Sequence, residues 1–511
     1  MASKILMGNM PELMEDILNN LNNEFYSLYS CALVSRHWCK ISIPILWRDP
    51  FSFEKKPLFI SNYFSSLGED EKFVLRKCGI NADLSKKLFD YARFLKVLDL
   101  SRLESKVNKW LDLELVNSNY YISLMYHIIN ILIKLFIESG ATLRKLDLHF
   151  SEFLEFSPEI FYSLGENKKI FSQLQDLSLG IILDSSIESV TTLLKILAKN
   201  TTKIRSLKFD GFYSDYEPQL FHALLYALIC IIKSQEQLRQ FSLIGGEDFP
   251  SEFYGIISAL ESQQNSLQEV IIENCGYSEE FEILNNCKKL EILRIRYCSD
   301  EILLKILNHQ VNTLEIVDYM FEETTISTIK QILEKCGTSL QRLMIDSIDD
   351  EIWEESLLLD SLKSFCPNIT YLYISNVEFS TQLVELIGKL QKLQFLTLVC
   401  NDFISGEELK TLVIQFAEIL PLTLQYLDFR DDWLNSFIDI LLNHCSAPLK
   451  KLLIDHLVKK KYAKALIEFC TRNKTLNYVG VDRYLKLNKK IRKEVKKYVT
   501  LVPYEHIVVN C

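Results

Sequence analysis

Two kinds of hydrophobic spacing alternate along most of the 511-residue chain. A six-residue window of the form L-x-x-L-x-L recurs, and in most windows its apolar fourth and sixth positions flank a polar fifth. This period-2 alternation is typical of a β-strand with one buried face. Between windows the apolar residues recur at the three- and four-residue steps of an amphipathic helix, as in residues 187–200. The windows begin at Leu95, Leu143, Leu174, Ile204, Leu238, Leu267, Leu290, Val311, Leu340, Ile369, Leu393, Leu424, Leu449 and Leu476.

The mean interval between windows is about 29 residues, at the upper end of the range for leucine-rich repeats. One strand and one helix cannot bury their apolar sides alone, so the units are predicted to stack, with parallel strands on a concave face and helices outside. The predicted fold class is therefore α/β, with a sheet on the order of 65 Å long. The ninth residue of two units is Cys275 or Cys298. We interpret both as structural, because a solenoid turn offers no base to activate a thiol.

The first fifty residues lack this repeat and contain three short helical stretches. In the first, Pro11 lies near the first turn, and Leu13, Ile17 and Leu21 form an apolar stripe. The second covers residues 25–34, and the third runs from 32 to 51, with Pro44 predicted to interrupt it. Three such helices enclose too little apolar area to be stable alone, so another surface must cover them.

This N-terminal pattern resembles the F-box, which has a Leu-Pro pair, an aliphatic stripe on its first helix, a Val-x-x-x-Trp step and a final Leu-Trp pair. The matching positions are Met10-Pro11, Leu13, Ile17, Leu21, Val34, Trp38 and Leu46-Trp47. Met10 replaces the usual leucine, and one residue fewer separates Pro11 from the stripe. The resemblance covers residues 8 to about 51. Because an F-box followed by leucine-rich repeats is an established architecture, it extends to nearly the whole chain, which looks most like fungal members.

The resemblance implies a role in protein–protein interaction. In the family, the F-box binds the small adaptor subunit of a cullin–RING (SCF) ubiquitin ligase, and the repeats bind the substrate. Carried over to this sequence, the adaptor-binding residues would be Met10, Pro11, Leu13, Ile17, Leu21, Val34, Trp38 and Trp47, with the two tryptophans holding the helices together. Trp38 fits either role. The alternative is that these helices only cap the first repeat, whose apolar edge needs a cover.

The expected domains are an F-box at 1–51, a connector with a capping repeat at 52–94, a solenoid of about 14 repeats at 95–485 and a basic C-terminal cap at 486–511. Residues 73–80 are a candidate degenerate first strand. Residues 449–511 contain 16 Lys/Arg and 5 Asp/Glu, a balance of +11, which leaves −21 for the rest of a chain with a net charge of −10. We interpret residues 484–498 as a final helix that covers the last repeat through Leu485, Ile491 and Val495. A phosphate- or nucleic-acid-binding surface is the alternative.

Motifs for catalysis are missing from the sequence: there is no G-x-x-x-x-G-K-[ST], G-x-G-x-x-G, H-E-x-x-H or G-x-S-x-G. Thirteen cysteines without a C-x-x-C pair fit neither a disulfide framework nor a zinc site. His127 and His222 are interpreted as core or boundary residues. We therefore expect no enzyme activity, metal or cofactor. We also expect a cytoplasmic or nuclear location without membrane insertion, because the most apolar run, residues 220–232, is too short to span a bilayer.

The third, fifth and seventh side chains of each window are predicted to point from the concave face. Tyr371, Phe395 and Tyr426 hold the third position in three successive units. Aromatic and arginine side chains are enriched in binding hot spots, which suggests a substrate-binding surface here. Its residues would be Arg294, Arg296, Arg342, Tyr371, Tyr373, Phe395 and Tyr426. The alternative is that these aromatic residues only pair across neighbouring strands.

The sequence thus predicts a substrate-recognition subunit of an SCF-type ubiquitin ligase. Its partners would be the adaptor subunit, through it the cullin, and a protein substrate that the sequence does not identify. Such a subunit acts by proximity, since it raises the local concentration of substrate lysines near the charged ubiquitin carrier. The second interpretation is a repeat scaffold or inhibitor without a ligase link. The third is a nucleic-acid-associated protein that acts through its basic tail, and we regard nucleic acid as the weaker partner.

Overall fold

The computed structural model describes residues 11–21, 24–80, 85, 87–115, 121–149, 160, 163–164, 167–180, 187–212, 218–246, 250–306, 311–348, 352–401, 407–429, 433–455, 457, 460–481 and 489–509. The chain divides into two compact units. Unit 1 comprises residues 1–248 and 254–263, and unit 2 comprises residues 249–253 and 264–511. Each unit is described by itself.

Unit 1 begins with helices and continues into repeats. The helices before the first strand are α2 (Pro11–Asn19), α3 (Phe25–Ala32), α4 (Arg36–Leu46), α5 (Ile60–Tyr63) and α6 (Glu69–Lys77). The repeats contain β1 (Val97–Asp99), α7 (Leu100–Glu114), α8 (Tyr121–Glu138), β2 (Lys145–Leu148), β3 (Asp176–Leu179), α10 (Ile187–Asn200), β4 (Ser206–Phe212), α11 (Pro218–Ser234) and β5 (Gln240–Gly245). Strands β1 to β5 pair in parallel, in the order of the sequence.

Unit 2 repeats the same strand-and-helix alternation throughout. Its strands are β6 (Glu269–Glu273), β7 (Ile292–Arg296), β8 (Thr313–Asp318), β9 (Arg342–Ser347), β10 (Tyr371–Glu378), β11 (Phe395–Asn401), β12 (Tyr426–Phe429), β13 (Lys451–Ile454), β14 (Tyr478–Val481) and β15 (Thr500–Pro503). Its α-helices are α12 (Asp300–Lys305), α13 (Glu323–Cys336), α14 (Glu355–Phe365), α15 (Thr381–Lys389), α16 (Glu407–Ile419), α17 (Ile438–His444), α18 (Lys460–Arg472) and α19 (Lys489–Val495). Neighbouring strands from β6 to β15 are parallel.

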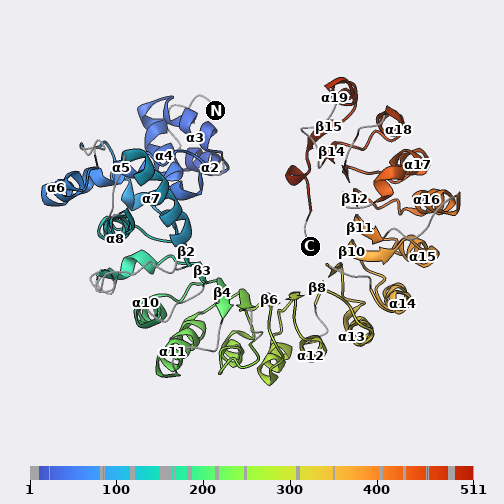
Figure 1. Ribbon diagram of the computed structural model, residues 1–511, viewed down its shortest axis with the longest axis horizontal. Helices are drawn as coiled ribbons and strands as arrows, with labels where there is room; N and C mark the ends of the chain where they lie inside the picture. Colours follow the sequence, from blue (N-terminus) through green and yellow to red (C-terminus); the bar gives the residue numbers. More distant parts are fainter. Residues whose placement is uncertain are drawn as a thin grey trace. The chain divides into compact units, whose positions relative to one another are not determined.

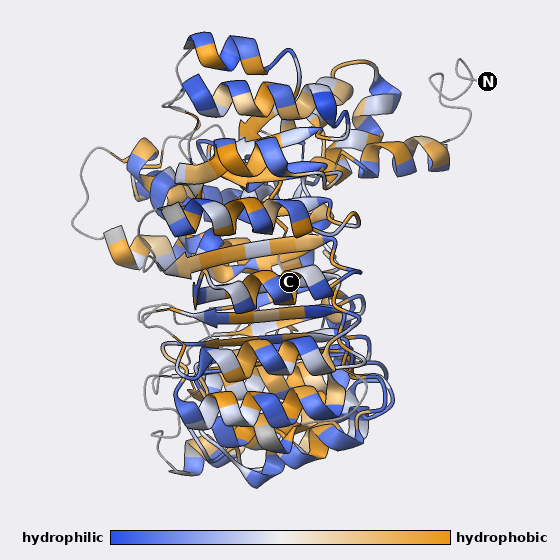
Figure 2. Cartoon of the chain, turned by 90° about the vertical axis from the view of Figure 1, so that its right-hand side faces the viewer, coloured by the Kyte–Doolittle hydropathy of each residue, from blue (hydrophilic) through white to orange (hydrophobic). Residues whose placement is uncertain are grey.

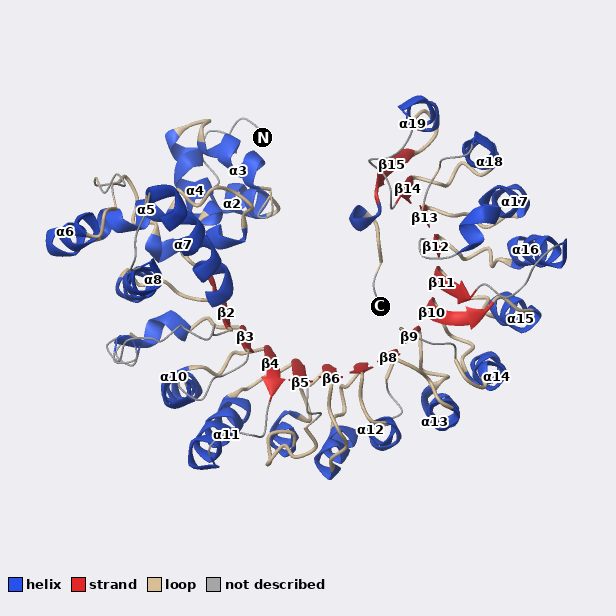
Figure 3. Cartoon of the chain, in the orientation of Figure 1, coloured by secondary structure: helices blue, strands red, loops and turns tan. Residues whose placement is uncertain are grey.

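The strands of unit 2 form one layer, and the helices lie on its outer side (Figures 1 and 3). Apolar and polar residues alternate around these helices (Figure 2), as expected for elements with one buried side. In β9, Leu343 and Ile345 are fully buried toward the helices, whereas Arg342 and Met344 are only partly buried on the opposite face. We call this opposite face, which carries the third, fifth and seventh window positions, the inner face. The predicted α/β solenoid is confirmed, with a strand in every one of the fourteen windows.

Three local expectations were wrong. Residues 73–80 do not form a strand, because most of them belong to α6. The Glu71 side chain accepts from the Gly68 N–H at the start of α6, and Arg76 and Lys77 lie in its last turn. These interactions at the two helix ends stabilise a helix, although the apolar residues between 73 and 80 suggested a strand. Helix α4 also continues through Pro44 to Leu46. Ile45 and Leu46 are 2% and 5% exposed, and their packing compensates for the missing hydrogen bond.

The third expectation concerns the end of the repeats. Strand β15 lies beyond residue 485, where we placed the end of the solenoid, and pairs in parallel with β14. Its sequence lacks the leucine spacing that marks the other windows. The backbone of β15 pairs with the free edge of β14, and this pairing does not require the L-x-x-L-x-L pattern. The sheet therefore has one strand more than the windows predicted.

Candidate functional sites

The first candidate surface is formed by the N-terminal helices α2, α3 and α4. Met14 and Leu18 on α2 are each 1% exposed, and Leu28 on α3 is fully buried. Leu13 and Ile17 lie on another side of α2 and are 43% and 47% exposed. Two of the three residues of the predicted stripe, Leu13 and Ile17, therefore face solvent, and the core of the small domain uses the neighbouring face of α2. The third, Leu21, follows the end of the helix at Asn19.

The turn between α3 and α4 adds two more exposed aliphatic side chains. Ser35 caps α4, because its hydroxyl accepts from the Trp38 N–H at 3.2 Å. This cap fixes the turn, in which Leu33 is 71% and Val34 64% exposed. We call Leu13, Ile17, Leu33 and Val34 the helical apolar surface. Leu33 was not among our predicted site residues, because nothing in its spacing distinguishes a residue that packs inside from one left outside.

The other predicted residues of this region lie in different environments. Trp47 is 9% exposed and packs on Tyr91 and Tyr63, with ring centroids 4.0 and 5.1 Å away. Leu21 and Trp38 are partly buried. Pro11 is the first residue of α2, and Met10 lies outside the described residues. Trp47 therefore joins the N-terminal helices to the following segment, whereas we expected it to hold these helices to one another.

Arg48 connects the N-terminal helices to the first repeat. Its carbonyl oxygen accepts from the N–H groups of Lys96 and Val97, at 2.9 and 3.0 Å. Its guanidinium donates to Asn19 Oδ1 at 2.5 Å and forms an ion pair with Glu15 at 3.4 Å. Because the backbone of Arg48 continues the hydrogen-bond pattern of β1, the helical apolar surface is held on the edge of the repeat array.

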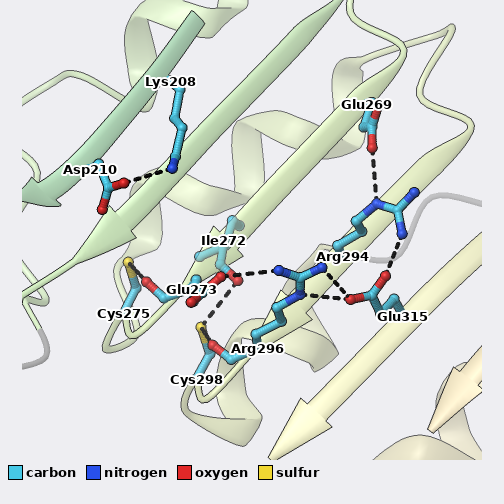
Figure 4. A network of polar contacts seen from close by, with 10 residues as sticks. All are labelled: Lys208, Asp210, Glu269, Ile272, Glu273, Cys275, Arg294, Arg296, Cys298 and Glu315. Atoms are coloured by element: carbon cyan, nitrogen blue, oxygen red, sulfur yellow. Dashed lines mark hydrogen bonds and ion pairs between the residues drawn. The ribbon is translucent and has the colours of Figure 1, made fainter. Parts of the chain in front are cut away.

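The second candidate surface lies on the inner face of unit 2, where β6, β7 and β8 carry a ladder of charges (Figure 4). Arg294 donates to Glu269 at 2.9 Å and to Glu315. Arg296 donates to Glu315 at 2.6 Å and to Glu273 at 3.3 Å. Burial acts to lower the pKa of both arginines, but their carboxylate partners outweigh burial and leave each pKa raised. Both arginines therefore already have carboxylate partners in the protein itself.

An aromatic row adjoins this ladder. Tyr371, Phe395 and Tyr426 occupy the same register on β10, β11 and β12, with ring centroids 6.4 and 5.9 Å apart. We call these three residues the aromatic row. Arg342 of β9 lies over the Tyr371 ring at 4.5 Å, and Tyr373 donates from its hydroxyl to Asp346 at 3.4 Å. The structure thus brings together the predicted aromatic residues, with the predicted arginines beside them.

The aromatic row is covered by the protein's own chain. Tyr371 and Tyr426 are each only 1% exposed. The residues that cover them belong to the segment after β15, including Val508 and Val509. The sequence contained no signal for this contact, because it joins residues more than eighty positions apart without a shared motif.

Cys275 and Cys298 follow β6 and β7 and point toward backbone carbonyls (Figure 4). The Cys275 thiol donates to the Glu273 carbonyl at 3.2 Å, and the Cys298 thiol donates to the Arg296 carbonyl at 3.1 Å. Burial raises the pKa of Cys298 to about 12, so its thiol stays protonated at neutral pH. Both contacts support the structural interpretation of these cysteines.

The third candidate site is a polar cluster on the inner face of unit 1, which was not predicted. His149, which follows β2, bonds through Nδ1 to Asp147 and through Nε2 to Asp210 at 3.4 Å. Lys208 of β4 adds an ion pair with Asp210 at 2.6 Å (Figure 4). Gly180 lies against the imidazole, where a side chain would collide with the ring. The hydrogen bonds to Asp147 and Asp210 raise the pKa of His149 to about 9, whereas the bonds from His149 and Lys208 lower the pKa of Asp210 to about 2.

Two other histidines lie elsewhere than expected. His127 on α8 and His222 on α11 are exposed, so their interpretation as core or boundary residues was wrong. Within the described ranges, no group of three His, Cys, Asp or Glu side chains is arranged to hold a metal ion. In the same part of the chain, no helix combines the length and the apolar character needed to cross a bilayer.

The described part of the basic tail begins with helix α19 and continues into β15 and a short 3₁₀ helix. Ile491 is 8% exposed and Val495 is fully buried, so they cover the last repeat as predicted. Leu485 lies outside the described residues. Lys493, Lys496 and Lys497 face solvent. This arrangement is the amphipathic covering helix expected from the sequence.

Comparison with known families decides the identity of the N-terminal helices. Residues 11–52 match the family model described as F-box-like. These helices are an F-box-like domain. The chain therefore combines an F-box-like domain with a leucine-rich-repeat solenoid. The resemblance to fungal members in particular stays a prediction.

Several solved structures have a similar fold at low sequence identity. The structure titled "Rad7 and Elc1 complex in yeast" is 14% identical and has a TM-score of 0.39, with 80% of this chain and 93% of that chain covered. The leucine-rich-repeat-containing protein LegL7 from Legionella pneumophila is 15% identical and has a TM-score of 0.29, with 72% and 92% covered. No curated protein matched the sequence.

Proposed function

We propose that the chain is the substrate-recognition subunit of an SCF-type ubiquitin ligase. The F-box-like domain docks on the adaptor subunit and through it on the cullin, and the repeats bind a protein substrate. The observation that carries the proposal is the helical apolar surface. Leu13, Ile17, Leu33 and Val34 remain 43–71% exposed on the F-box-like domain, and burial of each in an interface would contribute about 1.5–3 kcal/mol.

In this proposal the chain needs no reactive side chain of its own. The adaptor and cullin hold the charged ubiquitin carrier, and the repeats hold the substrate, so the rate depends on local concentration and orientation. The continuous hydrogen bonding from Arg48 into β1 supports this role, because it restricts motion between the adaptor-binding domain and the first repeat.

The substrate surface is proposed on the inner face of unit 2, at Arg294, Arg296, Arg342, Tyr371, Tyr373, Phe395 and Tyr426. The charge ladder there fixes the arginines in place before any partner arrives, and preorganised side chains lose less entropy on binding. Since each arginine of the ladder already contacts two carboxylates, we expect it to orient a substrate rather than neutralise a strongly acidic one.

Co-purification with the SCF adaptor and cullin tests the adaptor-binding role. The double variant Leu13→Glu and Ile17→Glu should lower adaptor affinity about 100-fold, because it places two charges in an apolar interface. The matched control is Leu88→Glu, since Leu88 is 84% exposed and lies outside the F-box-like domain.

Equal adaptor recovery from the wild type, the double variant and the control would contradict the proposal. That result would favour the alternative, a repeat scaffold or inhibitor without a ligase link. Thermal unfolding of all three proteins should agree closely, because the substituted side chains are exposed in this chain.

A further inference from the structure

The chain after β15 runs along the inner face of unit 2 (Figure 3). It forms the short 3₁₀ helix η10 (Tyr504–His506) and continues through Ile507, Val508 and Val509. We call residues 504–509 the inner segment. Parallel strands leave their inner face lined by side chains, so this segment binds to side chains rather than to a strand edge.

Two hydroxyl groups of the aromatic row hold the backbone of one residue. The Val509 N–H donates to the Tyr426 hydroxyl at 3.3 Å, and the Tyr371 hydroxyl donates to the Val509 carbonyl at 3.3 Å. Tyr426 in turn donates to Asp428 at 3.0 Å, which leaves its oxygen oriented as an acceptor. Both backbone groups of Val509 are thus satisfied without regard to its side chain.

Aliphatic contacts hold the rest of the inner segment. Ile507 is 6% exposed and packs with Tyr426 and Leu453, and its carbonyl accepts from Lys451 at 3.5 Å. Val508 and Val509 pack against the same cluster but remain partly buried. One well-buried side chain and a few long hydrogen bonds hold this segment, and such sparse contacts favour local opening.

A glycine makes room for the inner segment. Gly480 lies on β14 at the fifth window position, which normally carries a side chain on the inner face. A Cβ atom there would approach Ile507 and the Tyr504 backbone to 3.1 Å. The backbone of Gly480 does not need a positive φ, so close approach is the physical reason for a glycine.

A pocket of about 200 Å³ lies beside Val508 and Val509. Its other walls include Arg294, Arg296, Glu315 and Tyr373. The pocket offers space for one further side chain of a bound peptide, next to the residue held by the two tyrosines.

We propose that the inner face of β10–β13 is a peptide-binding surface, which the inner segment occupies in cis and a protein partner occupies by displacing it. The partner contributes a segment with two or three consecutive aliphatic side chains, because Ile507, Val508 and Val509 show what this surface accepts. The two tyrosine hydroxyls bind the backbone of any residue, and the aliphatic cluster selects the side chains. The partner is a ligase substrate only if the proposed function holds, whereas the peptide binding is independent of it.

The experiment uses a chain that ends at Pro503 and a fluorescent peptide with the sequence of residues 504–511, in which Ser replaces Cys511. Anisotropy should show the truncated chain binding this peptide at least about tenfold more tightly than the intact chain, which carries its own competitor. A scrambled peptide should not bind. In the truncated chain, Tyr371→Phe with Tyr426→Phe should weaken binding about fivefold or more, because only the two hydroxyls are removed.

Tyr478→Phe is the matched control for those substitutions. Tyr478 lies in the same register on β14, is 42% exposed and should tolerate the change without effect. If the truncated chain does not fold, the full-length chain with Ile507→Glu is used in its place. This substitution should expel the inner segment because it places a charge in the aliphatic cluster. Equal binding by intact and opened chains, or by scrambled and native peptides, would overturn the inference, as would failure of both opened chains to bind.

Adaptor co-purification from the same preparations separates this inference from the proposed function. Adaptor binding without peptide binding overturns only the peptide surface. Peptide binding without adaptor binding overturns only the ligase role.

Discussion

The F-box-like domain and the inner face of unit 2 both carry apolar side chains outside the helix–strand core, yet they differ in what covers them. Leu13, Ile17 and Val34 remain 43–64% exposed, whereas Tyr371 and Tyr426 are 1% exposed beneath the chain's own inner segment. The first surface is open to another polypeptide, and the second already has an occupant. Exposure therefore separates a surface ready to bind from one that must first be opened.

The two surfaces also differ in how they treat polar groups. The helical apolar surface is purely aliphatic, which suits permanent burial against a rigid partner. The inner face combines aromatic rings with a charge ladder and with two tyrosine hydroxyls, one of which donates to the backbone and one of which accepts from it. Such a surface favours a defined orientation of its ligand, because each polar group must be satisfied on binding.

The largest expected effect contrasts the two sides of α2. Leu18→Ala should lower the free energy of unfolding by about 2–5 kcal/mol, since Leu18 is 1% exposed and its truncation leaves a cavity. Ile17→Ala on the exposed side should change it by no more than about 0.5 kcal/mol. Urea unfolding of unit 1 measures both. Similar losses for the two variants would mean that Ile17 also belongs to the core, and the open surface would lose its basis.

The next effect concerns the charge ladder. Glu315→Ala should destabilise the protein by about 2–4 kcal/mol, because Glu315 is 3% exposed between Arg294 and Arg296. Glu291→Ala is the control, since Glu291 is exposed on the same unit. Chemical unfolding followed by fluorescence compares the variants. A loss no greater than that of the control would show that the remaining partners, Glu269 and Glu273, suffice to hold both arginines.

A smaller effect probes the inner segment through Gly480. Gly480→Val should cost about 1–3 kcal/mol in the intact chain, because the new side chain meets Ile507 and Tyr504. In the chain that ends at Pro503, the same substitution should be nearly neutral. The two changes in unfolding free energy form a double-mutant cycle, and their difference measures the contact between position 480 and the inner segment. Equal costs in both backgrounds would place the strain within β14 instead of the inner segment.

The smallest effect is the pH dependence of the His149 cluster. The pKa of His149 is raised to about 9 from an unfolded value of 6.5, so its stabilisation is fully present below about pH 6.5 and is lost as pH rises through about 9. His149 is more than a third exposed, and solvent screening limits the contribution to less than about 1 kcal/mol. Unfolding of wild type and His149→Gln at about pH 6 and about pH 10 measures it. The two proteins should differ more at the lower pH, and a larger difference at the higher pH would contradict the assigned sign.

Local patterns predicted the elements of this protein well where burial repeats regularly. The window at Leu340 placed Leu343 and Ile345 toward the helices and Arg342 on the inner face, as the structure has them. The pattern predicted less where one interaction competes with another. Residues 73–80 looked strand-like, but capping at Gly68 made them helical. Strand β15 carried no window signature and was added by pairing with β14.

The residues of the candidate sites differ in the same way: local patterns predicted some of them and could not predict others. Leu13 and Ile17 could be read from the helical period of α2, and Tyr371, Phe395 and Tyr426 from their shared third position in successive windows. Val34 could be read only from the resemblance to the F-box pattern. Which apolar side of α2 faces solvent could not be read from the chain, since Leu13 and Met14 are both apolar. The hydrogen bond between His149 and Asp210 could not be read from the chain either, because it depends on the register between β2, β3 and β4.

By itself the sequence determined the F-box-like helices, the repeat period and the row of aromatic side chains, because these depend on the periodic order of apolar residues within elements and on its recurrence from one window to the next. Only the tertiary structure decided that the helical apolar surface stays open and that Tyr504–Val509 covers the aromatic row. The physical reason is that coverage depends on packing between residues far apart in the chain, through nondirectional apolar contacts and a few hydroxyl groups that leave no periodic pattern.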